Sequence, residues 1–298
     1  EVQDDGLETV PANLVIDAMG RSSPMPGYLG DRGLGEAPVH ATGISISYST
    51  ILLHVPKRWL CDPWACVLRA TAPDRTRGAT MTPIEGNRWL LSMVSRFGDQ
   101  LPTELTDCVA FTESLETPEI FERVRHAELA VKAKRFQIPE SRVTCFDQMS
   151  DYPMGLLPLG DVIGTFNPLL AQGMTIAALH AETLGAKLAA HVGLGQELNL
   201  ASLAADYIPA VTELSVKAWT AGVYADMLYP ATKGERPADF DDYHAFRRAL
   251  RGMMLEDPEI HRLAVRVTQL LDPPSVLPRD EILARVVSES VGSCRSDV

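Results

Sequence analysis

Short runs of apolar and β-branched residues dominate the first half of the chain, and each run predicts a β-strand. The first run, 13–18, lies between a proline and a Gly-Arg-Ser-Ser-Pro loop, so it predicts a buried strand that ends in a loop. Glu85-Gly86-Asn87 predicts a hairpin turn between two later runs. Further strands are predicted over 43–55, 64–71, 78–82, 88–95 and 128–137.

Two helices are predicted among these strands, and longer helices are predicted after them. The segments 103–115 and 118–126 have helical spacing, and Thr117 with Pro118 supplies an N-cap followed by a proline at the first helical position. The middle of the chain therefore predicts an antiparallel sheet with helices on one side. Beyond residue 157 helical spacing predominates, which predicts a mainly helical second half.

The longest predicted helix begins at Asn167 and Pro168, a good N-cap and a good first helical residue. Apolar or small residues follow on every face to about residue 190, so we expect a buried helix. The 20 residues 162–181 carry no formal charge, but a membrane span here would place a helix start inside lipid, so no integral membrane segment is expected. Unpaired N–H groups at this helix start could instead bind an anion or an electron-rich oxygen.

Composition narrows the class of protein. A chain of 298 residues has room for about two domains, and 46% hydrophobic with 22% charged residues is ordinary for a globular protein. The net charge of -12 would repel a phosphate backbone, so nucleic acid is not an expected partner. Five cysteines and seven histidines without a metal-ligand spacing predict free thiols, a reducing compartment and no metal site. The acidic first residues lack the features of a signal peptide, which also favours a cytoplasmic protein.

One block of the second half resembles a known family. Leu159-Gly160-Asp161, followed by Phe-Asn-Pro-Leu-Leu-Ala-Gln-Gly-Met at 166–174, resembles the second flavin signature of FAD-dependent monooxygenases of the aromatic-hydroxylase type, which are related to geranylgeranyl reductases and flavin halogenases. The resemblance implies that Asp161 hydrogen-bonds the ribityl hydroxyls of FAD. It also implies that the helix starting at Pro168 points N–H groups at the pyrimidine edge of the isoalloxazine. The implied cofactor contacts in this block are Gly160, Asp161, Asn167, Pro168, Gln172, Gly173 and Met174.

Residues 12–23 resemble another patch of the same family, a strand that ends in Asp-Ala-x-Gly-x-x-Ser, which makes Asp17, Gly20 and Arg21 further implied cofactor contacts. A weaker similarity extends to Trp219, Asp226, Pro230 and Gly234. The implied fold is of the α/β or α+β class: the remainder of a Rossmann-like FAD-binding domain, an inserted antiparallel-sheet substrate domain and a C-terminal helical region. The implied domains are a partial FAD-binding domain at 1–40, the substrate domain at 41–150, an FAD-binding segment with the long buried helix at 151–195, and the helical region at 196–298.

The chain also departs from the family. Family members begin with a βαβ unit whose Gly-x-Gly-x-x-Gly turn binds the FAD pyrophosphate, whereas the nearest string here, 33–38, ends in proline and follows no strand. Val162 stands where the family usually has alanine, and Ala171 where it usually has glycine. We therefore expect the C-terminal two-thirds of such a flavoprotein, a fragment that binds FAD weakly or not at all by itself and whose candidate partner is a missing N-terminal FAD-binding half.

The resemblance implies an FAD-dependent oxidoreductase, a monooxygenase or hydroxylase that uses NAD(P)H as reductant and acts on a small organic substrate. The flavin performs the chemistry in this family, so no catalytic side chain is predicted. Three alternatives remain: an isoprenoid-reductase-like flavoprotein, a non-catalytic binding module, and one half of a split enzyme. The split enzyme would expose an apolar face around 14–18 and 162–176.

Overall fold

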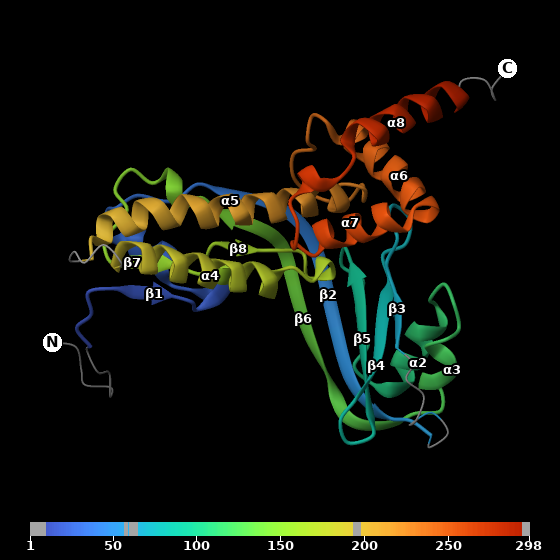
Figure 1. Ribbon diagram of the computed structural model, residues 1–298. Helices are drawn as coiled ribbons and strands as arrows, with labels where there is room; N and C mark the ends of the chain where they lie inside the picture. The colour runs from blue at the N-terminus through green and yellow to red at the C-terminus, as the bar shows by residue number, and fades with distance from the viewer. Residues whose placement is uncertain (1–9, 57–58, 60–64, 193–197, 294–298) are drawn as a thin grey trace. The chain divides into compact units, whose positions relative to one another are not determined.

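The computed structural model describes residues 10–56, 59, 65–192 and 198–293, with side chains described as far as residue 288. The chain forms two compact units (Figure 1). The first unit consists of Glu1–His40, Arg142–Tyr224 and Arg236–Val298, and the second consists of Ala41–Ser141 and Ala225–Glu235. The predicted strand start at Trp64, and Cys61 and Cys294 among the predicted free thiols, lie outside the described residues.

A six-stranded sheet has the strand order β3-β4-β5-β2-β6-β8. The pairings of β3 with β4, β4 with β5, β5 with β2 and β6 with β8 are antiparallel. The turn between β4 and β5 has positive φ at Gly86 and Asn87, and Ile84 pairs with Arg88, which confirms the predicted hairpin. The strands are β2 Val39–His54, β3 Cys66–Leu68, β4 Gly78–Ile84, β5 Arg88–Arg96, β6 Glu128–Thr144 and β8 Gly164–Thr165.

The two faces of the sheet in the second unit differ in burial because alternate side chains point to opposite sides. One face packs against α2 (Leu105–Glu113) and α3 (Phe121–Val124) (Figure 1), as predicted. The helix predicted over 118–126 is shorter than expected, since only its middle forms an α-helix. Side chains buried on the packed face include Ile51, Leu53, Ala79, Met81, Trp89, Leu91 and Met93.

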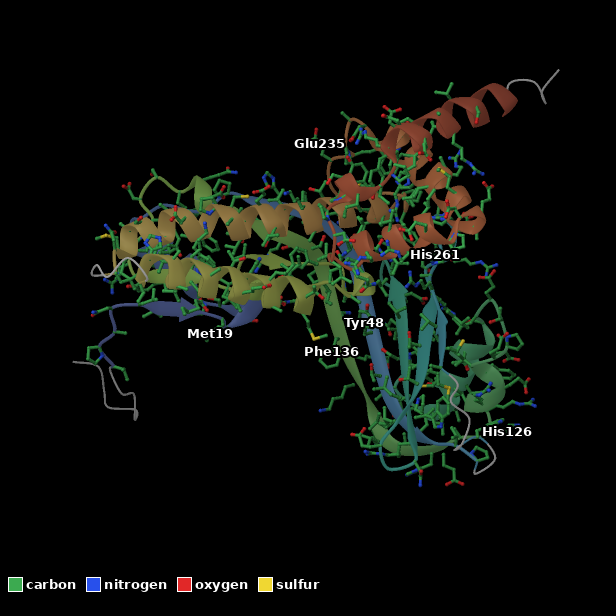
Figure 2. All side chains as sticks on the ribbon, in the orientation of Figure 1. Met19, Tyr48, His126, Phe136, Glu235 and His261 are labelled. Atoms are coloured by element: carbon green, nitrogen blue, oxygen red, sulfur yellow. The ribbon has the colours of Figure 1, made fainter. Side chains whose placement is uncertain are left out.

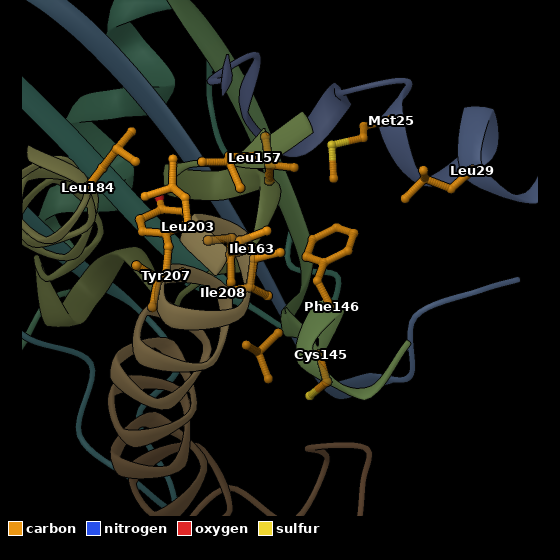
Figure 3. Packing of buried hydrophobic residues seen from close by; sticks show 14 residues of the cluster. Met25, Leu29, Cys145, Phe146, Leu157, Ile163, Leu184, Leu203, Tyr207 and Ile208 are labelled. Atoms are coloured by element: carbon orange, nitrogen blue, oxygen red, sulfur yellow. The ribbon is translucent and has the colours of Figure 1, made fainter. Parts of the chain in front are cut away.

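In the first unit β1 (Val15–Asp17) pairs in parallel with β7 (Leu156–Pro158), at the position of the predicted first strand. The expectation that this strand is buried is wrong, because Val15 and Ile16 are exposed. Two long helices, α4 (Gly173–Val192) and α5 (Leu200–Asp226), lie side by side (Figure 1). Side chains from these elements and from the short helix α1 (Met25–Asp31) form one core, which includes Phe146, Ile163 and Tyr207 (Figure 3). The Tyr207 hydroxyl donates to the carbonyl oxygen of Pro158 at 2.9 Å and so ties α5 to β7.

Three further helices form a separate core in the first unit: α6 (Phe240–Glu256), α7 (Pro258–Thr268) and α8 (Arg279–Ser293). The Asp257 carboxylate accepts the N–H groups of Glu259 and Ile260, so this residue is the N-cap of α7. The predicted mainly helical second half is therefore confirmed. Within the described residues no helix combines the length and the apolar character needed to cross a bilayer.

Candidate flavin site

The Asp17 carboxylate at the end of β1 organises the loop that follows it. Its Oδ1 atom accepts the N–H of Met19 at 2.9 Å, and its Oδ2 atom accepts the hydroxyl of Ser23. The Ser23 oxygen in turn accepts the N–H of Met25 at 2.9 Å, where α1 begins. Both carboxylate oxygens of Asp17 thus accept hydrogen bonds from the loop that follows it. This side chain therefore stabilises the conformation of that loop.

The loop after β1 and the turn after β7 lie together. Gly20 and Gly160 have φ values of +76° and +68°, a left-handed conformation that glycine adopts at little cost. A Cβ atom built at Gly20 would lie 3.9 Å from the Cβ atom of Asp161. The structure therefore brings the two segments with family resemblance, 141 residues apart at Gly20 and Asp161, onto one surface.

Asp161 offers a free carboxylate on this surface. The residue is exposed, and its side chain accepts no hydrogen bond from the residues that the structure describes. Partial burial raises the pKa of Asp161, and the positive charge of nearby Arg21 opposes that rise. The Arg21 backbone is held in place because its carbonyl oxygen accepts from Arg142 Nη2 at 3.1 Å. A carboxylate in this state is a ready acceptor for hydroxyl donors.

The predicted helix start at Pro168 is wrong. Asn167 caps a single 3₁₀ turn, Pro168–Leu170, through a 2.9 Å bond from the N–H of Leu169 to its Oδ1 atom. Ala171 then takes a left-handed conformation with φ +55°, which interrupts the helical path. The α-helix α4 begins only at Gly173. Asn167 is buried, and its side-chain oxygen accepts the N–H of Leu169. This side chain therefore stabilises the 3₁₀ turn.

The start of α4 lies beside the Asp161 turn. A Cβ atom at Gly160 would meet the Cβ atom of Ala177 at 3.4 Å, so the turn packs on the second turn of the helix. The first N–H groups of α4, at Gly173 and Met174, have no intrahelical partner, and no acidic side chain occupies this first turn. Met174 is 88% exposed, and Gln172 is turned away because its amide donates to the Thr268 carbonyl at 3.2 Å. The helix end therefore presents donors and positive dipole charge on the surface that holds Asp161.

The expectation that α4 is buried on every face is also wrong. Only Ile176, His180 and Leu184 are buried, which is a single stripe with helical spacing. His180 was not among the predicted site residues. It nevertheless contacts the site, because its Nδ1 atom accepts the N–H of Gly160 at 3.1 Å. The sequence signal for a buried histidine was its spacing: Ile176 and Leu184 lie four residues before and four residues after it, on the same face of a helix.

Ala171→Gly is expected to raise the free energy of unfolding by about 1 kcal/mol. A left-handed conformation costs a residue with a Cβ atom roughly 1–2 kcal/mol, and the greater freedom of glycine in the unfolded chain takes back part of the gain. The matched control is Ala178→Gly, at an exposed position inside α4. This replacement should lower the free energy of unfolding by about 1 kcal/mol. Urea unfolding followed by circular dichroism measures both. A loss of stability in both variants would contradict the left-handed assignment.

The second unit has a polar sheet face opposite its packed face. We call it the open face and define it by six half-buried residues in register across three strands: Thr50, Leu52, Thr80, Thr82, Leu90 and Ser92. The hydroxyls of Thr50 and Ser92 lie 3.0 Å apart. Tyr48 points to the same side of β2 as Thr50, and burial raises its pKa to about 12 against the opposing charge of Arg96.

A cleft of about 500 Å³ adjoins the open face at Tyr48. It is lined by β2, by the loop after β5 and by β6, where Phe136 lies on the strand next to Tyr48 (Figure 2). The volume is in the range of small-molecule sites. Among the described residues no group of three or more His, Cys, Asp or Glu side chains is placed to hold a metal ion.

Comparisons with known proteins place this geometry in a fold. No protein-family model matches the chain. Among curated proteins, protein Rv3254 of Mycobacterium tuberculosis is 24% identical over 292 residues, which covers 95% of this chain and 59% of that protein. Among solved structures, the anhydrotetracycline hydroxylase OxyS of Streptomyces rimosus matches with a TM-score of 0.54 and 16% identity, over 87% of this chain and 46% of that chain.

Two more solved structures agree with this result. The flavin-dependent brominase Bmp2 matches with a TM-score of 0.53 and 14% identity, over 94% of this chain and 64% of that chain. A variant of Klebsiella pneumoniae HpxO complexed with FAD matches with a TM-score of 0.53 and 15% identity, over 87% of this chain and 61% of that chain. The chain therefore shares its fold with part of each of these solved proteins. It spans 59% of the length of its curated relative and 46% to 64% of these solved chains.

Proposed function

We propose that the chain is the C-terminal part of an FAD-dependent monooxygenase that hydroxylates a small organic substrate. The observation that carries the proposal is the Asp161 carboxylate, which accepts no hydrogen bond within the described residues and lies beside the free N–H groups of α4. The fold shared with flavin-dependent enzymes supports the choice of FAD as the group that fills this surface. When bound, the flavin would supply electron transfer and oxygen activation, with NAD(P)H as the proposed reductant.

Each residue of the site has a proposed task toward FAD. Asp161 would accept the ribityl hydroxyls, and the Gly173 and Met174 N–H groups would donate to the electron-rich pyrimidine edge. Gly20 and Gly160 would let the backbone approach the cofactor closely, since neither carries a Cβ atom. Three other predicted contacts would support these groups indirectly, because their side chains form hydrogen bonds to the backbone: Asp17, Asn167 and Gln172.

The open face is the proposed substrate wall. Its hydroxyl groups would orient polar groups of a substrate, and Leu52 and Leu90 would contact its apolar part. The chemistry of this mixed face fits a small organic molecule with a few oxygen functions. OxyS is an anhydrotetracycline hydroxylase by its description, so a substrate of this general class is consistent with the fold.

The proposed partner is an N-terminal FAD-binding half. Val15 and Ile16 in β1 are 49% and 43% exposed, and Met19 after it is 70% exposed. Among the described residues β1 pairs only with β7, so a strand edge is open for a further part of the protein. Of the apolar face expected around 14–18 and 162–176 for one half of a split enzyme, the part around 14–18 is exposed. In the other part, Ile163, Phe166 and Ile176 are buried within the chain.

Weak FAD binding by the chain is the expected result of the test. In a titration to millimolar FAD followed by amide NMR shifts, we expect saturable shifts at Asp161, Gly173 and Met174 and little change on α8. Asp161→Ala should weaken binding by roughly 10- to 150-fold, because it removes a charged acceptor of a hydrogen bond worth about 1.5–3 kcal/mol. Asp151→Ala is the matched control, since it removes an exposed carboxylate of the same unit away from the turn.

Three results would count against the proposal. The absence of saturable shifts at these amides, or equal weakening by Asp161→Ala and Asp151→Ala, would remove the flavin site. Tight stoichiometric binding by the chain alone would instead contradict the proposed dependence on an N-terminal half.

A further inference from the structure

His180 occupies a fully buried position in the middle of α4. Its side chain has no solvent exposure and lies in the buried stripe between Ile176 and Leu184. A buried imidazole is costly unless both ring nitrogens have partners. The flavin contacts proposed above make no use of this side chain, although it reaches the turn that carries Asp161.

The two ring nitrogens of His180 have different partners. Nδ1 accepts the N–H of Gly160 at 3.1 Å, so this nitrogen carries no proton. The single proton of the neutral ring is therefore on Nε2, which lies 3.1 Å from the hydroxyl oxygen of Ser215 on α5. Burial lowers the pKa of His180 to about 4, and a hydrogen bond with the Val211 backbone opposes this shift. At neutral pH the ring stays an acceptor toward Gly160.

The connection from β7 to the Asp161 turn is held by three hydrogen bonds. The Tyr207 hydroxyl donates to the Pro158 carbonyl, and the N–H of Leu159 donates to the Asp17 carbonyl, each at 2.9 Å. The third bond, from the N–H of Gly160 to Nδ1 of His180, fixes the peptide between Leu159 and Gly160, one peptide before Asp161. Gly160 itself restricts its backbone little because it has no Cβ atom, so the orientation of this peptide depends on its hydrogen bond.

We propose that His180 is a positioning residue for the flavin contact, because its Nδ1 atom fixes the Gly160 peptide and thereby aims the Asp161 carboxylate. The inference rests on the proposed function of Asp161, but the link between His180 and the turn exists without any cofactor. Removal of the acceptor would leave the Gly160 N–H buried without a partner, and the turn would rotate to solvate or re-bond it.

Two replacements at one position separate this role from simple packing. His180→Asn keeps an acceptor near the place of Nδ1, since both atoms are attached to Cγ, and its amide NH₂ takes the donor role. His180→Leu fills similar space without any acceptor. Thr183→Val is the control on the same helix: it removes a hydroxyl that donates to the Leu179 carbonyl and does not reach the Asp161 turn.

The first readout uses the chain without flavin. In NMR spectra the Gly160 amide and the Asp161 carboxyl carbon should shift strongly in His180→Leu, stay near their wild-type values in His180→Asn, and not change in Thr183→Val. The second readout is the FAD titration described above. His180→Leu should weaken FAD binding by about tenfold, and His180→Asn should restore it to within about threefold of wild type.

The outcomes keep the two proposals distinct. If the chain shows no FAD binding but the flavin-free shifts follow the expected order, the flavin proposal fails while the His180 link to Asp161 stands. If His180→Asn and His180→Leu change these shifts or the FAD affinity equally, the positioning role is wrong and His180 only fills space. Should His180→Leu not fold, His180→Gln replaces it, because its amide reaches the place of Nε2; equal shifts in the Gln and Asn variants would overturn the proposal.

Discussion

Asp226→Ala is expected to lower the free energy of unfolding by about 3–5 kcal/mol, the largest effect of any single replacement discussed for this chain. Asp226 has no solvent exposure, and its Oδ1 atom accepts from Arg96 Nη1 at 2.9 Å. The Arg96 guanidinium is also buried and lies over the ring of Tyr229, 4.6 Å from the ring centroid. Removal of the carboxylate would leave a buried positive charge without its counter-charge, which is far more costly than the loss of an exposed ion pair.

Urea unfolding of wild type and variants measures this effect. Glu213→Ala breaks the exposed pair with Lys217 on α5 and should have a much smaller effect. The double replacement of Arg96 by Met and Asp226 by Leu should recover most of the stability, because it removes both buried charges together. A loss for Asp226→Ala no greater than that for Glu213→Ala would show that the pair is not buried in solution.

Acid is expected to destabilise the chain through His180 by roughly 3 kcal/mol between pH 6.5 and pH 4. The pKa of His180 is lowered to about 4 from an ordinary value of 6.5, chiefly by burial. In this interval the unfolded chain binds a proton at His180 that the folded chain does not bind, so stability falls as the pH falls. Above about pH 7.5 the ring is almost entirely neutral in both states and contributes almost no slope.

His180→Asn isolates this contribution, because the amide does not titrate. Urea unfolding at several pH values from 7 to 4.5 should show a smaller acid loss in the variant than in wild type, although carboxylates affect both proteins. Parallel pH profiles for the two proteins would contradict a buried neutral His180. This experiment needs no flavin, so its result is independent of the proposed function.

The strands were predictable because burial on one face imposes a regular pattern on the sequence. β2, β4 and β5 lie close to where the β-branched and apolar runs predict them, and Gly86-Asn87 marks the hairpin. β6 begins at its predicted residue but continues beyond 137 to Thr144. The start of α4 was not predictable by the same reasoning. Asn167 and Pro168 favour a first helical turn of any kind, and nothing in the local pattern shows that Ala171 adopts a left-handed conformation.

The candidate site was predictable only where its residues lie within a short motif. Gly160 and Asp161 stand out from the sequence in this way, and the structure places Gly20 beside them. His180 and Asp226 depend on partners 20 and 130 residues away, so composition and spacing carry no record of their contacts. The side chains of Asp17, Asn167 and Gln172 turn inward to backbone or hydroxyl partners, which is a matter of loop geometry that a motif does not specify.

The alternation along β4 and β5 has a consequence for how this protein can change over evolutionary time. In β5, Leu90 and Ser92 lie on the open face. The alternate residues Leu91 and Met93 lie on the opposite face, in the core with α2 and α3. Replacements at the first pair alter the chemistry presented to a bound molecule without creating a void in the core, and replacements at the second pair do the reverse. The proposed substrate contacts and the core contacts therefore lie at interleaved positions of the same strands. New ligand preferences can arise by drift at every second residue while the intervening residues stay under constraint.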